Sequence, residues 1–259
     1  MEAKAIIDEL AKMGVEAEMH EVIKNGIKKT GIALKKHDGI SPVVYLEEFS
    51  GTPEEIAAEM ADLFKQYADG SLGFDVNLLK SPEWILEKIH IGMQRSSEEA
   101  DLVKAESGFP GIEKYLYLKM NGNMTAKVKF EILEAVGVTV QEAWESAERN
   151  TFADGETVIT DLAKILGIPC EVDAPKLYIV TNKDGNRGSS AVLDTEAIRK
   201  YFGSDKSFTV FPSSIHEYIL VPKEDCEERE GLDEMVQQIN AAEVAPEEQL
   251  GDCAFDIAV

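Results

Sequence analysis

Two apolar runs near the C-terminal end constrain the fold more than any other stretch. Residues 208–211 and 215–221 are rich in β-branched and aromatic side chains, and Pro212, Ser213 and Ser214 separate them. Such runs favour buried strands, and a proline-containing connection favours a turn. We therefore predict a hairpin within a sheet, and its edge carries Ser213, Ser214, His216 and Glu217.

The N-terminal stretch predicts a helix followed by antiparallel strands. Apolar residues recur at helical spacing over residues 3–13, where Gly14 ends the pattern. Residues 17–49 then change to a β pattern that Asn25-Gly26 and His37-Asp38-Gly39 interrupt. Both interruptions suit tight hairpin turns, so we predict a three-stranded meander. Thr52 and Pro53 next predict the cap and first residue of a helix that ends near residue 67.

The rest of the chain mixes helical and strand patterns. We predict strands over residues 86–94, 115–120, 124–130, 176–182, 190–193 and 253–259. We predict helices over residues 97–105, 140–149, 158–166, 195–201 and 231–242. Thr139 is the expected cap of the helix over residues 140–149, and Asp194 or Thr195 is the expected cap of the helix over residues 195–201.

This order of elements indicates an α+β fold with two lobes. The N-terminal α+β lobe, residues 1–150, contains the antiparallel meander and its helices. The smaller C-terminal α+β lobe, residues 151–259, contains the hairpin. A chain of 259 residues is long enough for two ordinary domains.

The charge limits the classes of partner. The chain has 49 acidic and 26 basic residues, a formal net charge of -23. A surface this negative repels phosphate backbones and anionic lipid, so we expect no direct binding to nucleic acid or membrane. The excess charge then serves solubility, or it imitates nucleic acid in the basic groove of a nuclease or polymerase.

The sequence also predicts a cytoplasmic protein with reduced cysteines. The first ten residues carry charges and lack the apolar core of a signal peptide. No apolar run approaches the roughly 18 residues of a membrane helix. Cys170, Cys226 and Cys253 are widely spaced without a CxxC pair, which argues against a disulfide framework and a structural zinc site.

The hairpin residues are the candidate catalytic group. Ser213, Ser214, His216 and Glu217 supply the residue types of a nucleophile, a base and an orienting carboxylate. Successive side chains of a strand point to opposite faces, however, so His216 and Glu217 should diverge. We favour a structural interpretation, in which the serines bind backbone groups of the turn and His216 donates a hydrogen bond that fixes the loop.

Other site types find less support. His20, His37, His90 and His216 are scattered and follow no metal-ligand spacing, so we predict no metal site. The loop Asp184-Gly-Asn-Arg-Gly188 lacks a dinucleotide or P-loop pattern and does not precede a helix pattern. We predict an ordinary loop there, with anion binding as the alternative, and no cofactor.

Three blocks near the C-terminal end resemble a known family. They are Leu177-Tyr-Ile-Val-Thr-Asn-Lys183, Phe211-Pro-Ser-Ser-Ile-His-Glu217 with Val221-Pro222, and Met235-Val-Gln-Gln-Ile-Asn240 followed by Val244-Ala-Pro-Glu-Glu248. The chain resembles uncharacterised proteins of gut anaerobes, often encoded among mobile-element genes, over its last third and upstream through the Asn121-Gly122-Asn123 turn and the Trp144 helix. Residues 250–259 depart from the more aromatic, basic end of that family. The resemblance implies a mobile-element setting and no particular activity.

Three functional hypotheses follow. The first is a non-enzymatic accessory or interaction protein with a protein partner, because no catalytic or cofactor motif is complete. The second is an acidic inhibitor that mimics nucleic acid and blocks a nuclease or another enzyme that binds DNA or RNA, as a counter-defence of a mobile element. The third is a small hydrolase that uses Ser213, His216 and Glu217.

Overall fold

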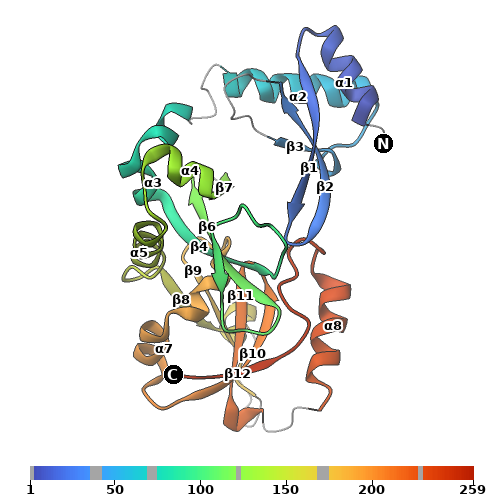
Figure 1. Cartoon of the computed structure of the whole chain (residues 1–259). Coiled ribbons are helices and arrows are strands. Elements are labelled where there is room, and N and C mark those ends of the chain that lie inside the picture. The colour runs from blue at the N-terminus through green and yellow to red at the C-terminus, as the bar shows by residue number, and fades with distance from the viewer. Residues whose placement is uncertain (1–2, 36–42, 69–74, 121–123, 168–174, 227–229) are drawn as a thin grey trace. The chain divides into compact units, whose positions relative to one another are not determined.

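The computed structural model describes residues 3–35, 43–68, 75–120, 124–167, 175–226 and 230–259 (Figure 1). The chain forms two compact units, Met1–Leu78 and Leu79–Val259. Helices and antiparallel sheets occur in both, which confirms the α+β fold. The predicted division at residues 150 and 151 lies inside the second unit. No helix in the described ranges is long and apolar enough to cross a membrane.

The first unit contains the predicted meander. The strands β1 (Ala17–Lys24), β2 (Ile27–Leu34) and β3 (Val43–Tyr45) pair antiparallel in that order. Asn25 and Gly26 have φ angles of 48° and 80°, as a two-residue hairpin turn requires. The predicted turn at residues 37–39 lies outside the described residues.

Two helices cover the core of this unit. The helices α1 (Ala3–Lys12) and α2 (Pro53–Ala68) bury Ile6, Leu10, Met60 and Phe64 against Ile32 of β2. The short 3₁₀ helix η1 (Leu46–Glu48) follows β3. Thr52 begins α2 as predicted: its hydroxyl accepts the Glu55 N–H at 3.3 Å, while its own N–H donates to the Glu55 carboxylate at 2.9 Å.

The second unit begins with a four-stranded sheet. The strands are β4 (Ile89–Arg95), β5 (Lys104–Glu106), β6 (Ile112–Lys119) and β7 (Thr125–Lys127), with β4, β5 and β7 all pairing with β6. Along the chain, this sheet is preceded by the 3₁₀ helix η2 (Val76–Lys80) and the helix α3 (Pro82–Lys88). It is followed by the helices α4 (Phe130–Val136) and α5 (Val140–Thr151). One sheet face packs Ile89, Ile91, Leu116 and Leu118 into a core with these helices.

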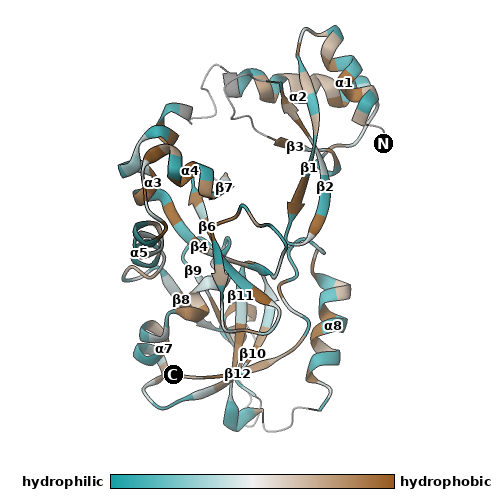
Figure 2. Ribbon diagram, viewed as in Figure 1, coloured by the Kyte–Doolittle hydropathy of each residue, from teal (hydrophilic) through white to brown (hydrophobic). Residues whose placement is uncertain are grey.

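The end of α5 closes the outer edge of β4. The Asn150 side-chain amide donates to the carbonyl oxygens of Leu86, Glu87 and Ile89 at 2.9, 3.1 and 2.8 Å. The Thr151 hydroxyl accepts the Ile91 N–H at 2.9 Å. Although α5 is hydrophilic over most of its length (Figure 2), it buries the small residues Ala143, Ser146 and Ala147. Side-chain hydrogen bonds thus replace a neighbouring strand here.

A five-stranded antiparallel sheet forms the rest of the unit, in the order β12-β10-β11-β9-β8. Its strands are β8 (Thr157–Asp161), β9 (Tyr178–Asn182), β10 (Ser207–Ser214), β11 (Glu217–Pro222) and β12 (Phe255–Ala258). The other elements are α6 (Leu162–Leu166), η3 (Gly188–Leu193), α7 (Thr195–Phe202), η4 (Lys223–Asp225) and α8 (Leu232–Glu243). Phe208, Val210, Tyr218 and Leu220 lie at the centre of its core.

The hairpin exists, but its turn is shifted. The strand β10 continues through Pro212, Ser213 and Ser214, and a register irregularity lies between Phe211 and Ser214. The turn consists of Ile215 and His216 instead of residues 212–214. A bulge accommodates proline within a strand because it interrupts the hydrogen-bond ladder.

Four other element predictions were wrong. Residues 86–88 continue α3, because Ser81 accepts the Trp84 N–H at 3.2 Å and Pro82 starts the helix. Residues 97–103 form no helix, and their Ser97 and Glu99 side chains bind neighbouring strands. Residues 157–161 are strand β8, so helix α6 is restricted to residues 162–166. Residues 190–193 belong to the buried 3₁₀ helix η3 and not to a strand.

Candidate functional site: an arginine held beside two tyrosines

The four residues predicted from the hairpin lie together at the end of β10 and the start of β11. The Ser213 hydroxyl lies 3.5 Å from the Glu217 carboxylate, and the Ser214 hydroxyl accepts the backbone N–H of His216 at 3.1 Å. Within the described residues, neither hydroxyl is hydrogen-bonded to the imidazole. Ser214 thus binds a backbone group of the turn, whereas Ser213 contacts a carboxylate side chain.

The imidazole of His216 instead holds a distant loop. Its Nδ1 accepts the backbone N–H of Arg187 at 3.1 Å, and its Nε2 lies 3.4 Å from the Glu248 carboxylate. Because Nδ1 accepts, the proton of the neutral ring is on Nε2, facing Glu248. His216 therefore fixes a loop, but as an acceptor and not as the donor that we predicted.

The loop that carries Arg187 is tightly held. Arg187 has a left-handed backbone with a φ of 51°, which is uncommon outside glycine. The Asn182 side chain donates to the Asn186 carbonyl at 2.8 Å and accepts the Asn186 N–H at 3.2 Å. A Cβ on Gly188 would lie 2.8 Å from the His216 carbonyl oxygen, so only glycine fits there. Ion pairs join Lys183 to Glu156 and Asp184 to Lys119.

The half-buried Arg187 side chain contacts two aromatic residues. Its Nη1 donates to the Tyr115 hydroxyl at 2.7 Å, and its Cζ lies 5.8 Å from the ring centroid of Tyr117. Among the described residues, no carboxylate lies within 4.0 Å of the guanidinium. A guanidinium has five N–H donors, so most of them remain open to a ligand.

Neighbouring cations on the same sheet face are paired. Lys127 lies 2.7 Å from Glu99 and Lys104 lies 3.1 Å from Glu113. Burial raises the pKa of the Glu113 carboxyl, but hydrogen bonds from Gln94, Ser97 and Lys104 outweigh it, and the pKa is lowered. Glu113 is therefore ionised and neutralises Lys104. Unlike these two lysines, Arg187 has no carboxylate partner among the described residues.

The phenol and imidazole groups around Arg187 are neutral near pH 7. Burial raises the pKa of the Tyr115 and Tyr117 hydroxyls, so both phenols stay protonated. Burial also lowers the pKa of His90, whose ring centroid lies 5.9 Å from that of Tyr117. The Nδ1 of His90 lies 2.9 Å from the Lys88 carbonyl oxygen and must donate to it. The site therefore combines the Arg187 guanidinium with neutral phenol and imidazole groups, and the Lys127–Glu99 ion pair lies beside them.

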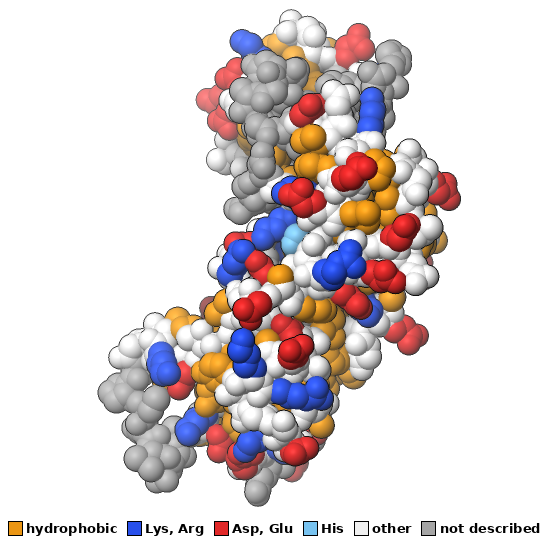
Figure 3. Space-filling view, turned by 90° about the vertical axis from the view of Figure 1, so that its left-hand side faces the viewer, with side chains coloured by type: hydrophobic (Ala, Val, Ile, Leu, Met, Phe, Trp, Pro, Cys, Tyr) orange, Lys and Arg blue, Asp and Glu red, His pale blue; other side chains and the backbone are white. Residues whose placement is uncertain are grey.

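The charge distribution elsewhere is mixed. On the face drawn in Figure 3, Lys and Arg side chains lie among Asp and Glu side chains, despite the net charge of -23.

No group of three His, Cys, Asp or Glu residues suitable for a metal ion occurs in the part of the chain that is described. Cys226 and Cys253 are both half-buried, while Cys170 lies outside the described residues.

Sequence reasoning singled out His216 but missed Arg187, Tyr115 and Tyr117 as a group. The two tyrosines alternate along β6 and therefore share a sheet face, which the sequence signals. Nothing in the sequence places Arg187 against them, because 72 positions separate it from Tyr115.

Comparisons with known proteins give one match. The model of a family described as "Family of unknown function (DUF5688)" matches residues 113–256, a range that includes Tyr115, Arg187 and His216. No curated protein and no solved structure matches the chain. The matched range contains all three blocks that carry the resemblance to uncharacterised proteins.

Proposed function

We propose that this chain, which belongs to the DUF5688 family of unknown function, is a non-enzymatic binding protein that recognises an anionic group through Arg187. One observation carries this proposal. The guanidinium is held by a hydrogen bond to Tyr115 and by the Tyr117 ring, yet no described carboxylate neutralises it. A carboxylate or phosphate of a partner molecule is the complementary group.

Physical chemistry favours such a ligand. A partly buried charge loses hydration, and proteins commonly compensate this loss with a paired charge. A guanidinium presents parallel N–H groups that bind both oxygens of a carboxylate or phosphate. The loop is held in place before the ligand arrives, so little conformational entropy is lost on binding.

The same geometry speaks against a hydrolase at the hairpin. His216 uses Nδ1 to accept a backbone N–H and directs Nε2 toward Glu248. A catalytic base would instead contact the serine hydroxyl that it activates. We propose that Ser213, Ser214 and Glu217 maintain the turn and that His216 positions Arg187.

The proposal also includes the compartment, the genetic context and the class of partner expected from the sequence. We place the protein in the cytoplasm, in a mobile-element context, with a protein as the bearer of the anionic group. The nucleic-acid mimic is the second candidate, and the net charge of -23 favours it. The two candidates predict different partners. A mimic presents its own anionic groups to a basic partner, whereas Arg187 binds an anionic group of the partner.

Titration with small anions tests the proposal. We expect inorganic phosphate or acetate to shift the backbone amide NMR signals of Arg187 and Gly188, with a Kd of about 1 mM, typical of a small contact. Arg187→Gln should weaken binding at least tenfold, and Arg187→Lys should retain part of it. Arg149→Gln is the matched control, because Arg149 also donates to a hydroxyl, that of Ser146 at 2.7 Å.

Two results would contradict the proposal. One is unchanged anion affinity in Arg187→Gln. The other is the absence of any shift at Arg187 with either anion up to roughly 50 mM, well above the expected Kd. Ester hydrolysis lost in both Ser213→Ala and His216→Ala, with both variants folded, would instead favour the hydrolase.

A further inference from the structure

One edge of the five-stranded sheet has unpaired backbone groups. The strand β8 is last in the order β12-β10-β11-β9-β8, and in the described part of the chain no strand pairs with its outer side. Strands with open edges can accept another strand through main-chain hydrogen bonds.

The register identifies the open groups. The Lys183 N–H donates to the Glu156 carbonyl, and the Leu162 N–H donates to the Leu177 carbonyl. Hydrogen-bonded positions alternate along an antiparallel strand, so Val158 and Thr160 also face β9. The N–H and C=O groups of Thr157 and Ile159 and the N–H of Asp161 therefore point away from the sheet, while the Asp161 carbonyl begins helix α6.

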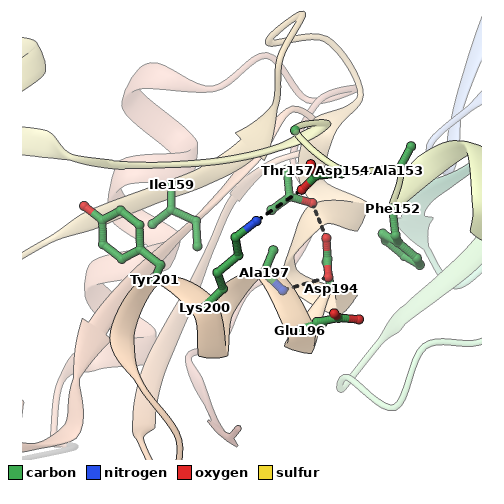
Figure 4. A pocket seen from close by; sticks show the side chains of 11 residues that line it. Phe152, Ala153, Asp154, Thr157, Ile159, Asp194, Glu196, Ala197, Lys200 and Tyr201 are labelled. Atoms are coloured by element: carbon green, nitrogen blue, oxygen red, sulfur yellow. Dashed lines mark hydrogen bonds and ion pairs between the residues drawn. The ribbon is translucent and has the colours of Figure 1, made fainter.

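A pocket of about 480 Å³ adjoins this edge (Figure 4). Two of the residues with outward backbone groups, Thr157 and Ile159, line it from β8, while Tyr201 lines it from α7. Phe152 lines it from the turn before β8. The pocket thus offers apolar surface for a side chain beside backbone groups for a strand.

The pocket is acidic. It is lined by Asp154, Asp194 and Glu196 and by a single basic residue, Lys200. Lys200 lies 3.2 Å from Asp154, but these side chains are 77% and 94% exposed, so the ion pair is weak and can be displaced. Asp194 caps α7 through the Ala197 N–H at 3.0 Å and accepts the Thr157 hydroxyl at 2.7 Å.

We propose that an extended, basic segment of a partner protein adds to β8 as a further strand. Its backbone would pair with Thr157, Ile159 and Asp161, an apolar side chain would enter the pocket, and Lys or Arg side chains would approach Asp154 and Glu196. This surface is separate from the proposed anion site at Arg187, and neither proposal depends on the other.

The acidic character of this edge favours a basic partner segment over a second copy of this chain as the added strand. A second copy of this chain, with a net charge of -23, is repelled from an acidic edge, whereas a basic segment is attracted. Short length and charged residues normally protect an edge against self-association. Here the same charges select the partner.

Synthetic peptides test the proposal on the full chain. The probe is acetyl-Lys-Val-Lys-Val-Lys-Val-amide, with a matched peptide in which Glu replaces Lys. Hydrogen exchange should slow at least tenfold at Thr157, Ile159 and Asp161 in the presence of the basic peptide and stay unchanged at Val158 and Thr160. The acidic peptide should not bind.

Backbone and charge contributions are separated by two further comparisons. N-methylation of the peptide residues that face β8 should weaken binding at least tenfold, while methylation of the alternate residues should not. The double variant Asp154→Asn, Glu196→Gln should weaken binding, whereas Glu234→Gln on α8 should not. Equal binding of both methylated peptides, or of the acidic and basic peptides, would overturn the proposal, as would unchanged exchange at Ile159.

Discussion

Asn150 offers a quantitative test of how the second unit is held together. Its side-chain amide contacts three carbonyl oxygens, those of Leu86, Glu87 and Ile89, at 2.9, 3.1 and 2.8 Å. The first two belong to the last turn of α3, whose final carbonyls have no partner within the helix. The third begins β4. Asn150→Ala removes all of these contacts.

The size of the effect follows from the number of hydrogens. The NH₂ group has two hydrogens for three acceptors, so it makes at most two strong hydrogen bonds. Each contributes about 0.5–1.5 kcal/mol, so Asn150→Ala should lower the free energy of unfolding by about 1–3 kcal/mol. Asn150→Asp should cost more, because a carboxylate of the same shape cannot donate and repels the carbonyls.

Urea unfolding followed by tryptophan fluorescence measures this effect selectively. Both tryptophans of the chain, Trp84 and Trp144, lie in the second unit, so the signal does not report on the first. Gln141→Ala is the control: Gln141 lies on the same helix and is exposed, where its amide donates to Glu145 at 2.9 Å. Asn150→Ala with the same unfolding midpoint as Gln141→Ala would refute the reasoning, as would a stable Asn150→Asp.

Three further predictions use the same assay. A Cβ on Gly92 would lie 2.7 Å from the Tyr115 ring, so Gly92→Ala should cost about 1–3 kcal/mol; wild-type stability would contradict this. Thr139→Ala breaks the capping box with Glu142 and should cost about 0.5–2 kcal/mol, whereas Thr139→Ser should cost little. Burial lowers the pKa of His90 below its unfolded value of about 6.5. Its stabilising contribution is complete above that value and is lost as the pH falls through the folded pKa. Wild type should therefore lose more stability than His90→Gln between pH 7 and pH 5, and parallel curves would exclude this.

The sequence predicted elements best where the cause is local. The Asn25-Gly26 turn, the Thr52 cap and the Thr139 cap were each confirmed. In each case the residues that form the hydrogen bonds or adopt the required φ angles lie within a few positions of one another. Local backbone preferences therefore suffice.

Prediction failed where distant residues decide the conformation. Residues 97–105 have a helical composition, but Ser97 and Glu99 find partners in Glu113 and Lys127 on neighbouring strands. Residues 190–193 form an apolar run typical of a strand, yet they belong to a 3₁₀ helix buried in the core. Periodicity in so short a run cannot distinguish these structures.

The candidate site shows the same division. The sequence by itself brought Ser213, Ser214, His216 and Glu217 together, and strand alternation placed Tyr115 and Tyr117 on one face. Only the tertiary structure brought the Arg187 backbone to His216, 29 positions away, and its guanidinium to Tyr115, 72 positions away. It also determined which cations have carboxylate partners. Those distances depend on the packing of two sheets, and no local preference encodes that packing.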